Sequence, residues 1–299
     1  MKFYNVFSGA LSGKTREAYI RNIEDRVFNS LHSYWYLRGY DDEKIIDAFK
    51  LTKGNIMIDS GAFTAWSKEI NLDVDKYLEW INKWDGYITL FGQIDVIPPK
   101  TANKQEIDEC CKKTWDNYLY MRERMKSPEK LLYTFHYGED FKWLKQALEY
   151  RDNEGKPIEY MALGGLVGRS TKQRISFLDK CFNIIKNSSN PNIKVHGFGV
   201  SSEKLWRRYP FESCDSFTPG MATNYTAEKE SRYKTDDYER IFKPRGWTRE
   251  ANIVPEITAE NEIQRQEKVN KKVDDKAKLL IKNIEYWNDL ANSITKTKY

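Results

Sequence analysis

The alternation of short apolar runs with helical patterns constrains the fold of this chain more than any other feature. Eight apolar or aromatic runs can be counted, at residues 2–7, 30–36, 55–58, 87–94, 131–135, 160–163, 194–198 and 213–216. Helical patterns follow most of them, at 15–28, 41–51, 74–84, 104–125, 141–150, 171–186 and, over a shorter stretch, 202–208. Strands that alternate with helices pair in parallel through right-handed crossovers. Eight such units favour an α/β fold of the (β/α)8 TIM-barrel type over an open doubly wound sheet.

Composition divides the chain into two predicted parts. Residues 1–225 hold the alternating units and are expected to form the barrel domain. Residues 226–299 are a charged, irregular stretch in which a helix is expected from about 263 to 294. Acidic and basic residues are almost evenly mixed there, so the stretch is no basic arm. We expect its helix to pack on the outside of the barrel with a solvated outer face.

Bulk properties bound the class of protein. The 299 residues suffice for one large α/β barrel or for two smaller domains, and 14% aromatic residues indicate a packed core rather than disorder. The net charge of +5, from 49 basic and 44 acidic residues, permits nucleic-acid binding without requiring it.

The cysteines indicate a reduced compartment rather than a metal site. The chain has 4 cysteines without Cys-x-x-Cys spacing, and no histidine follows His196. We therefore expect no structural zinc, no other metal and no cofactor. Few cysteines, no signal peptide and no long apolar segment predict a cytoplasmic protein that has no membrane association.

One stretch imitates a phosphate-binding loop. Gly9 and Gly13, followed by Lys14 and Thr15, come after a strand and open a helix. The P-loop motif has four residues between its glycines, whereas this chain has three, so its amides cannot wrap around a β-phosphate in the usual way. We expect Ser12 or Thr15 to cap the helix, and we expect no nucleotide hydrolysis.

Carboxylates and small residues follow four of the predicted strands. Asp59 comes directly after the run 55–58 and is followed by Ser, Gly, Ala and then Phe63. Related segments are Phe91-Gly-Gln-Ile-Asp95, Tyr160-Met-Ala-Leu-Gly-Gly165 and Cys214-Asp-Ser-Phe217. The active sites of (β/α)8 barrels gather at the C-terminal ends of the strands, so these segments predict one enzyme pocket. An aromatic ring beside an acid suits a flat ligand that stacks on the ring.

In their order and placement these motifs resemble those of the tRNA-guanine transglycosylase superfamily. Within it, the chain is most similar to phage-encoded relatives that insert 7-deazaguanines into DNA. The resemblance covers roughly residues 55–225 through five short motifs, and the rest matches only in its strand–helix rhythm. The tRNA enzymes carry a Cys-x-Cys-x-x-Cys…His zinc cluster near the C-terminus, and this chain has no cysteine after Cys214. That departure favours the DNA branch, which implies a phage enzyme in the cytoplasm of its host cell.

The resemblance implies an exchange of guanine in DNA for a free 7-deazaguanine base, such as 7-cyano-7-deazaguanine. Asp215 would form the covalent bond to the sugar, and Asp59 would act as general acid and base, because retention at the sugar carbon needs two inversions. Asp95 would read the Watson–Crick edge of guanine, since a carboxylate accepts from the ring imino N–H and the exocyclic amine together. Alternatives stay open: a turn or capping role for Asp215, an Asx-turn at Asp59, and a solvated Asp95 before two prolines.

The remaining substrate contacts are also implied by the resemblance. Gly164 and Gly165 would let the backbone approach the base, although glycine pairs also mark plain turns. Phe63 and Phe198 would sandwich the base, with core packing as the alternative for either ring. His136 stands where the tRNA enzymes carry a glutamine that contacts the base, so it either bonds the base or satisfies a neighbouring group.

Basic residues follow the same strands and predict contacts to phosphates. If the barrel forms, their loops surround the pocket, although ordinary solvated helix charge is the alternative. His196 is expected only to support the barrel rim. The predicted phosphate contacts are Arg169, Lys172, Lys204, Arg207 and Arg208, with Arg174, Lys100 and Lys104 on the same rim.

Three other functions compete with base exchange in DNA. They are the same chemistry on tRNA, a nucleoside hydrolase, and a non-catalytic barrel that binds nucleic acid. The pair Asp59 and Asp215 favours an enzyme, because a scaffold would not need two carboxylates at strand ends. The sequence does not determine the oligomeric state.

Overall fold

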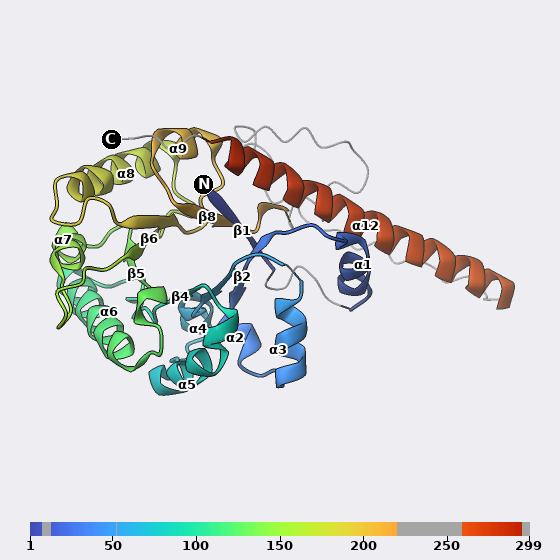
Figure 1. The fold of residues 1–299 in the computed structure, drawn as a ribbon, viewed down its shortest axis with the longest axis horizontal. Coiled ribbons are helices and arrows are strands. Elements are labelled where there is room, and N and C mark those ends of the chain that lie inside the picture. Colours follow the sequence, from blue (N-terminus) through green and yellow to red (C-terminus); the bar gives the residue numbers. More distant parts are fainter. Residues whose placement is uncertain (8–12, 52, 220–258, 295–299) are drawn as a thin grey trace.

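The computed structural model describes residues 1–7, 13–51, 53–219 and 259–294, and in this part the chain forms a closed parallel barrel (Figure 1). Each strand pairs in parallel with the next, and β8 closes the barrel by pairing with β1 through Lys2↔Ser213 and Tyr4↔Asp215. The predicted (β/α)8 fold is confirmed. The strands are β1 Lys2–Val6, β2 Asn29–Ser33, β3 Ile56–Asp59, β4 Leu90–Gly92, β5 Leu131–His136, β6 Tyr160–Gly164, β7 Lys194–Gly197 and β8 Ser213–Ser216.

Helices surround the barrel as an outer ring (Figure 1). Polar caps define several of their starts: Asp41 accepts from the amide of Lys44, and Asn103 and Ser170 each form a capping box. The helices are α1 Gly13–Ile23, α2 Tyr34–Leu37, α3 Asp42–Phe49, α4 Ala62–Ser67, α5 Val74–Trp84, α6 Lys104–Arg124, α7 Phe141–Glu149, α8 Thr171–Lys186, α9 Glu203–Arg208 and α12 Ala259–Ser293, with the 3-10 turns η1 Asp85–Tyr87 and η2 Pro128–Lys130.

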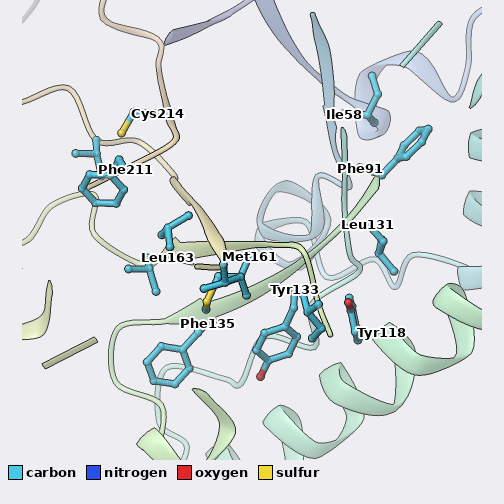
Figure 2. Close-up of a cluster of buried hydrophobic side chains, with 14 of the residues drawn as sticks. Ile58, Phe91, Tyr118, Leu131, Tyr133, Phe135, Met161, Leu163, Phe211 and Cys214 are labelled. Carbon is cyan, nitrogen blue, oxygen red and sulfur yellow. The ribbon is translucent and has the colours of Figure 1, made fainter. Parts of the chain in front are cut away.

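The strands bury both faces. Successive side chains of a strand point to opposite faces, so one set fills the barrel and the other packs under the helices. The outer set, drawn in Figure 2, includes Leu131 and Tyr133 of β5, beside Tyr118 of α6. The inner set is a separate cluster of Tyr4, Leu31, Met57, Leu90, Leu132 and Tyr160. The same alternation continues to the C-terminal ends of the strands, so the side chains of Asp59 on β3 and Asp215 on β8 point into the barrel.

The C-terminal helix α12 completes the outer ring of helices. It packs against α1, β1 and α9, along the seam between β8 and β1 (Figure 1). Trp287 stacks on Phe3 at a ring-centroid distance of 5.7 Å and meets Trp206 edge-on at 5.5 Å. An ion pair of 2.5 Å joins Arg26 to Glu285 at the edge of this contact. The helix expected at 263–294 is therefore present, and its inner face belongs to the core.

Two elements near β2 differ from the sequence expectation. The run 30–36 was expected to be one strand, but β2 ends at Ser33 and the next residues form the short helix α2. Aromatic residues favour strands in general, yet Tyr34 turns out of the sheet to pack its ring 4.7 Å from that of Tyr77 on α5. Helix α4, directly after Asp59, was not predicted.

Other boundaries differ by a few residues. Helix α1 ends at Ile23 rather than 28, because Glu24 adopts a left-handed conformation with φ 52°. The strand expected at 87–94 is reduced to Leu90–Gly92, preceded by η1. Ser12, one of the two predicted caps of the first helix, lies outside the described residues, as do residues 220–258, which include the first part of the charged stretch. Among the described residues no helix is long and apolar enough to cross a membrane.

Candidate active site at the barrel mouth

The structure brings the predicted carboxylates to one end of the barrel. Asp59 is the last residue of β3, Asp215 is the last but one of β8, and Asp95 follows β4 by three residues. Their charges act on one another, since those of Asp95 and Asp215 both contribute to raising the pKa of Asp59. His136, the last residue of β5, belongs to the same group of charges.

A tight turn aims the carboxyl of Asp59. The amide of Gly61 donates to Asp59 Oδ2 at 3.0 Å, which is an Asx-turn of the kind that the sequence left open. Gly61 has φ 77°, and a Cβ there would lie 2.5 Å from Ser33 Oγ and from Trp35 Cβ. Only glycine fits this position without strain, so the small residues after Asp59 have a structural reason.

The environment of Asp59 favours its protonated form. Desolvation by burial, helped by the charges of Asp95 and Asp215, raises the pKa of Asp59 from 3.8 to about 7, against the opposing effects of the Gly61 amide and of His136. A carboxyl with a pKa near the working pH can both give and take a proton. Asp59 therefore has the property that a general acid and base needs.

Asp95 and His136 form a charged pair that further polar groups support. Gln93 Nε2 donates to Asp95 Oδ1 at 2.9 Å, and His136 Nε2 lies 3.4 Å from Asp95 Oδ2. Glu139 accepts from the backbone amide of His136 and contacts its Nδ1, each at 3.0 Å. Burial lowers the pKa of His136, but the charges of Asp95 and Glu139 outweigh burial and raise the pKa well above its usual value. An imidazolium thus bridges two carboxylates at the mouth.

The glycine pair after β6 makes room for that imidazole. A Cβ on Gly164 would lie 2.7 Å from His136 Cδ2, so any larger residue would displace the ring. Gly165 has φ 71°, and a Cβ there would lie 3.0 Å from the backbone nitrogen of Tyr137. Both glycines therefore have a packing role beside His136, in addition to any approach of a ligand.

Asp215 is held by a buried network. Its Oδ1 lies 3.1 Å from His196 Nε2 and accepts from the amide of Gly199 at 2.9 Å. On the other side of the ring, His196 Nδ1 lies 2.7 Å from Ser213 Oγ, which in turn lies 2.8 Å from the hydroxyl of Tyr160. His196 is fully buried and Asp215 is 6% exposed. His196 was expected only to support the rim, whereas it contacts the candidate nucleophile directly.

The two predicted aromatic rings occupy different environments. Phe198 is half-buried, packs on the inner cluster and lies 4.6 Å from the ring of His196. Phe63 is 69% exposed and pairs with Trp66 at 5.7 Å, over which Lys100 Nζ lies at 5.9 Å. Core packing therefore does not explain Phe63, which stands open to a ligand at the mouth.

The predicted phosphate contacts divide into two groups. Arg169 covers the ring of Tyr137 at 4.6 Å, and Lys172 and Lys204 are exposed near the starts of α8 and α9. These three lie at the mouth, because helices begin at the C-terminal ends of the strands that they follow.

Arg207 and Arg208 lie at the far end of α9, and both are already paired. Arg207 pairs with Glu203 of the same helix at 2.7 Å. Arg208 binds both carboxylate oxygens of Asp179, in the middle of α8, at 3.0 Å each. Arg208 thus joins α9 to α8, whereas the pair of Arg207 stays within α9. The phosphate contacts of both arginines stay predictions.

Comparisons of the chain with models of known protein families and with curated proteins found no match. Within the described residues, no group of three or more His, Cys, Asp and Glu side chains is placed to hold a metal ion.

Proposed function

We propose that this protein is a transglycosylase that exchanges guanine in DNA for a free 7-deazaguanine through a covalent bond between Asp215 and the sugar. One observation carries the proposal: two carboxyl groups at one barrel mouth have opposite environments. Desolvation raises the pKa of Asp59 to about 7, whereas Asp215 accepts hydrogen bonds from His196 and Gly199. Pairs of acids whose environments differ in this way divide the work of acid and nucleophile.

The chemistry follows from that division. A carboxylate oxygen of Asp215 bonds to C1′ of the nucleotide, while the electron pair of the C1′–N bond leaves with guanine, which takes the proton of Asp59. The incoming base then gives a proton to Asp59 and attacks C1′, and the bond to Asp215 breaks. The two inversions restore the original configuration. Water must be excluded between the steps, because hydrolysis of the intermediate would leave an abasic site.

Recognition of the base rests on Asp95 and His136. Asp95 accepts from Gln93 and His136, and each carboxylate oxygen has a second lone pair that can accept from a guanine N–H. Both N–H groups of the His136 imidazolium already face carboxylates, those of Asp95 and Glu139, so His136 orients Asp95 toward the base. A base reaches such a site only after leaving its stack, which costs about a few kcal/mol. Exposed Phe63 and half-buried Trp66 offer rings on which a base displaced from the stack can rest.

DNA is the favoured substrate, because the chain has no cysteine after Cys214 and so lacks the zinc cluster of the tRNA enzymes. The test is to incubate the purified protein with duplex DNA, or with tRNA, and isotope-labelled 7-cyano-7-deazaguanine. Nucleosides are then released and identified by mass spectrometry. We expect label in deoxynucleosides and an equal release of guanine.

Variants and alternative products make this test specific. Asp215→Asn should abolish both exchange and the covalent complex, by several orders of magnitude. Asp116→Asn, which removes an exposed carboxylate paired with Lys112 on α6, is the matched control and should exchange bases normally. Label in tRNA alone would show that the substrate is tRNA rather than DNA. Abasic sites without label would indicate a hydrolase. Binding without either product would indicate a non-catalytic barrel.

A further inference from the structure

A chain of hydrogen bonds runs through the barrel interior and ends on Asp215. Ser213 and Asp215 occupy successive inward positions of β8, and the ring of His196 on the neighbouring strand β7 bridges them. The hydroxyl of Tyr160 on β6 extends the chain beyond Ser213 at 2.8 Å. All these side chains are at least nine-tenths buried, so their hydrogen-bond partners come from within the barrel.

The chemistry of each group determines which atom donates and which accepts in this series of hydrogen bonds. An ionised carboxylate only accepts, so the nitrogen that faces Asp215, Nε2 of His196, must carry a proton. Burial raises the pKa of Tyr160 far above its usual value, so its phenol keeps its proton and can donate to Ser213. Ser213 then donates to Nδ1 of His196. A neutral ring with its proton on Nε2 therefore uses every donor, whereas an imidazolium would donate to Ser213 from Nδ1 and leave one hydroxyl proton of the Tyr160–Ser213 pair without an acceptor among these side chains.

We propose that His196 is a positioning residue that selects which oxygen of Asp215 attacks the sugar. Oδ1 accepts from both His196 Nε2 and the Gly199 amide, at 3.1 and 2.9 Å. Oδ2 accepts no hydrogen bond from the described part of the chain, so its lone pairs are free to form the bond to C1′. This assignment rests on the proposed base exchange. It adds to that function the identity of the attacking atom and the group that fixes it.

The two donors on Oδ1 act most strongly in the second half of the reaction. When Oδ2 is bonded to C1′, Oδ1 is the carbonyl oxygen of an ester and carries little charge. As the incoming base attacks, the C1′–Oδ2 bond breaks and its electron pair returns to the carboxylate. Nε2–H and the Gly199 amide then stabilise the charge that develops on Oδ1. Loss of the donor on His196 should therefore slow discharge of the covalent complex.

Substitutions of His196 distinguish a role as hydrogen-bond donor from a role in packing alone. In His196→Leu, which has no donor, we expect the free base to discharge the covalent complex about ten- to a hundred-fold more slowly than in the wild type. His196→Gln keeps an N–H toward Asp215 and an acceptor toward Ser213, so it should recover most of that rate. His32→Gln is the matched control: His32 is also buried, but among the described residues it bonds Ser30 and packs on Phe7 and Phe49, away from Asp215, so discharge should be unchanged.

Nitrogen-15 NMR of the histidine rings tests the geometry without any activity. The chain has only 3 histidines, so the ring signals can be assigned with single substitutions. We expect the ring of His196 to carry a proton on Nε2, the nitrogen that faces Asp215. A neutral ring protonated on Nδ1 overturns the proposal even if exchange is active. Equal discharge rates for His196→Leu and wild type overturn the positioning role. The expected ring signal in a protein without exchange activity refutes the proposed function instead, and leaves the hydrogen-bond chain intact.

Discussion

Replacement of Asp59 by asparagine should stabilise the protein at neutral pH. The pKa of Asp59 is 3.8 in the unfolded chain and about 7 in the folded one, chiefly because burial desolvates the carboxyl. Between these values the folded state holds a proton that the unfolded state has lost, so stability falls as pH rises. Above pH 7 the folded protein carries the whole cost of an ionised, desolvated Asp59. Asparagine never ionises, and its amide oxygen can still accept from Gly61.

The size of the effect follows from the two pKa values. A tenfold change in a proton's dissociation constant corresponds to about 1.4 kcal/mol, so a rise in pKa from 3.8 to about 7 corresponds to roughly 4 kcal/mol. Entry of water and small movements of Asp95 and Asp215 would relieve part of this cost. We therefore expect Asp59→Asn to gain about 2 to 4 kcal/mol relative to the wild type between pH 4 and pH 7.5. For a chain of 299 residues that is roughly 3 to 6 °C in Tm.

Urea unfolding at pH 4 and pH 7.5 measures this gain directly. Asp108→Asn is a control of opposite sign, because hydrogen bonds from Lys142 at 2.6 Å and Trp143 at 2.9 Å lower the pKa of Asp108. That variant should be less stable than the wild type at pH 7.5. A stability difference between Asp59→Asn and wild type that stays constant from pH 4 to pH 7.5 would refute a raised pKa at Asp59.

Three further predictions concern activity and folding. Departure of guanine needs a proton on Asp59, so the rate of base exchange should decline above about pH 7, and pH–rate profiles at saturating substrate will show whether it does. Asp95→Asn should weaken guanine and deazaguanine binding by about 1–3 kcal/mol per lost partner in equilibrium titrations, with little change in the far-UV spectrum. Trp287→Ala should reduce the free energy of urea unfolding by about 3–5 kcal/mol, because the ring fills the space between Phe3 and Trp206; an unchanged midpoint would show that α12 is not part of the barrel core.

The order of elements could be predicted because it depends on local patterns. Apolar runs and helical patterns succeed one another along the chain, and eight repeats leave few topologies open. The wrong predictions also concerned local structure. At Tyr34 and Trp35, aromatic side chains with high strand propensity begin a helical turn, because their burial against α5 and Gly61 outweighs propensity.

The grouping of Asp59, Asp95 and Asp215 was predictable for a different reason. In a parallel barrel all C-terminal strand ends meet at one rim, so position in the strand suffices to bring them together. The contact of His196 with Asp215 required more, namely which inward positions of neighbouring strands lie at the same height. One sequence feature does indicate this contact. Ser213 and Asp215 are two residues apart on one strand, and a histidine on the preceding strand has two ring nitrogens that can contact both.

The charges at the mouth also decide which acid holds the proton. The carboxyl groups of Asp59, Asp95 and Asp215 converge there, and the imidazolium of His136 lies between Asp95 and a fourth carboxylate, Glu139. Asp215 accepts from two donors on Oδ1, and Asp95 from Gln93 and His136, whereas within the described residues Asp59 accepts from the Gly61 amide alone. A desolvated group of acids keeps its proton where fewest donors stabilise the negative charge, and Asp59 is the one whose pKa rises to about 7. The placement of donors therefore supports the proposed acid on β3 and the proposed nucleophile on β8, independently of the order of motifs in the sequence.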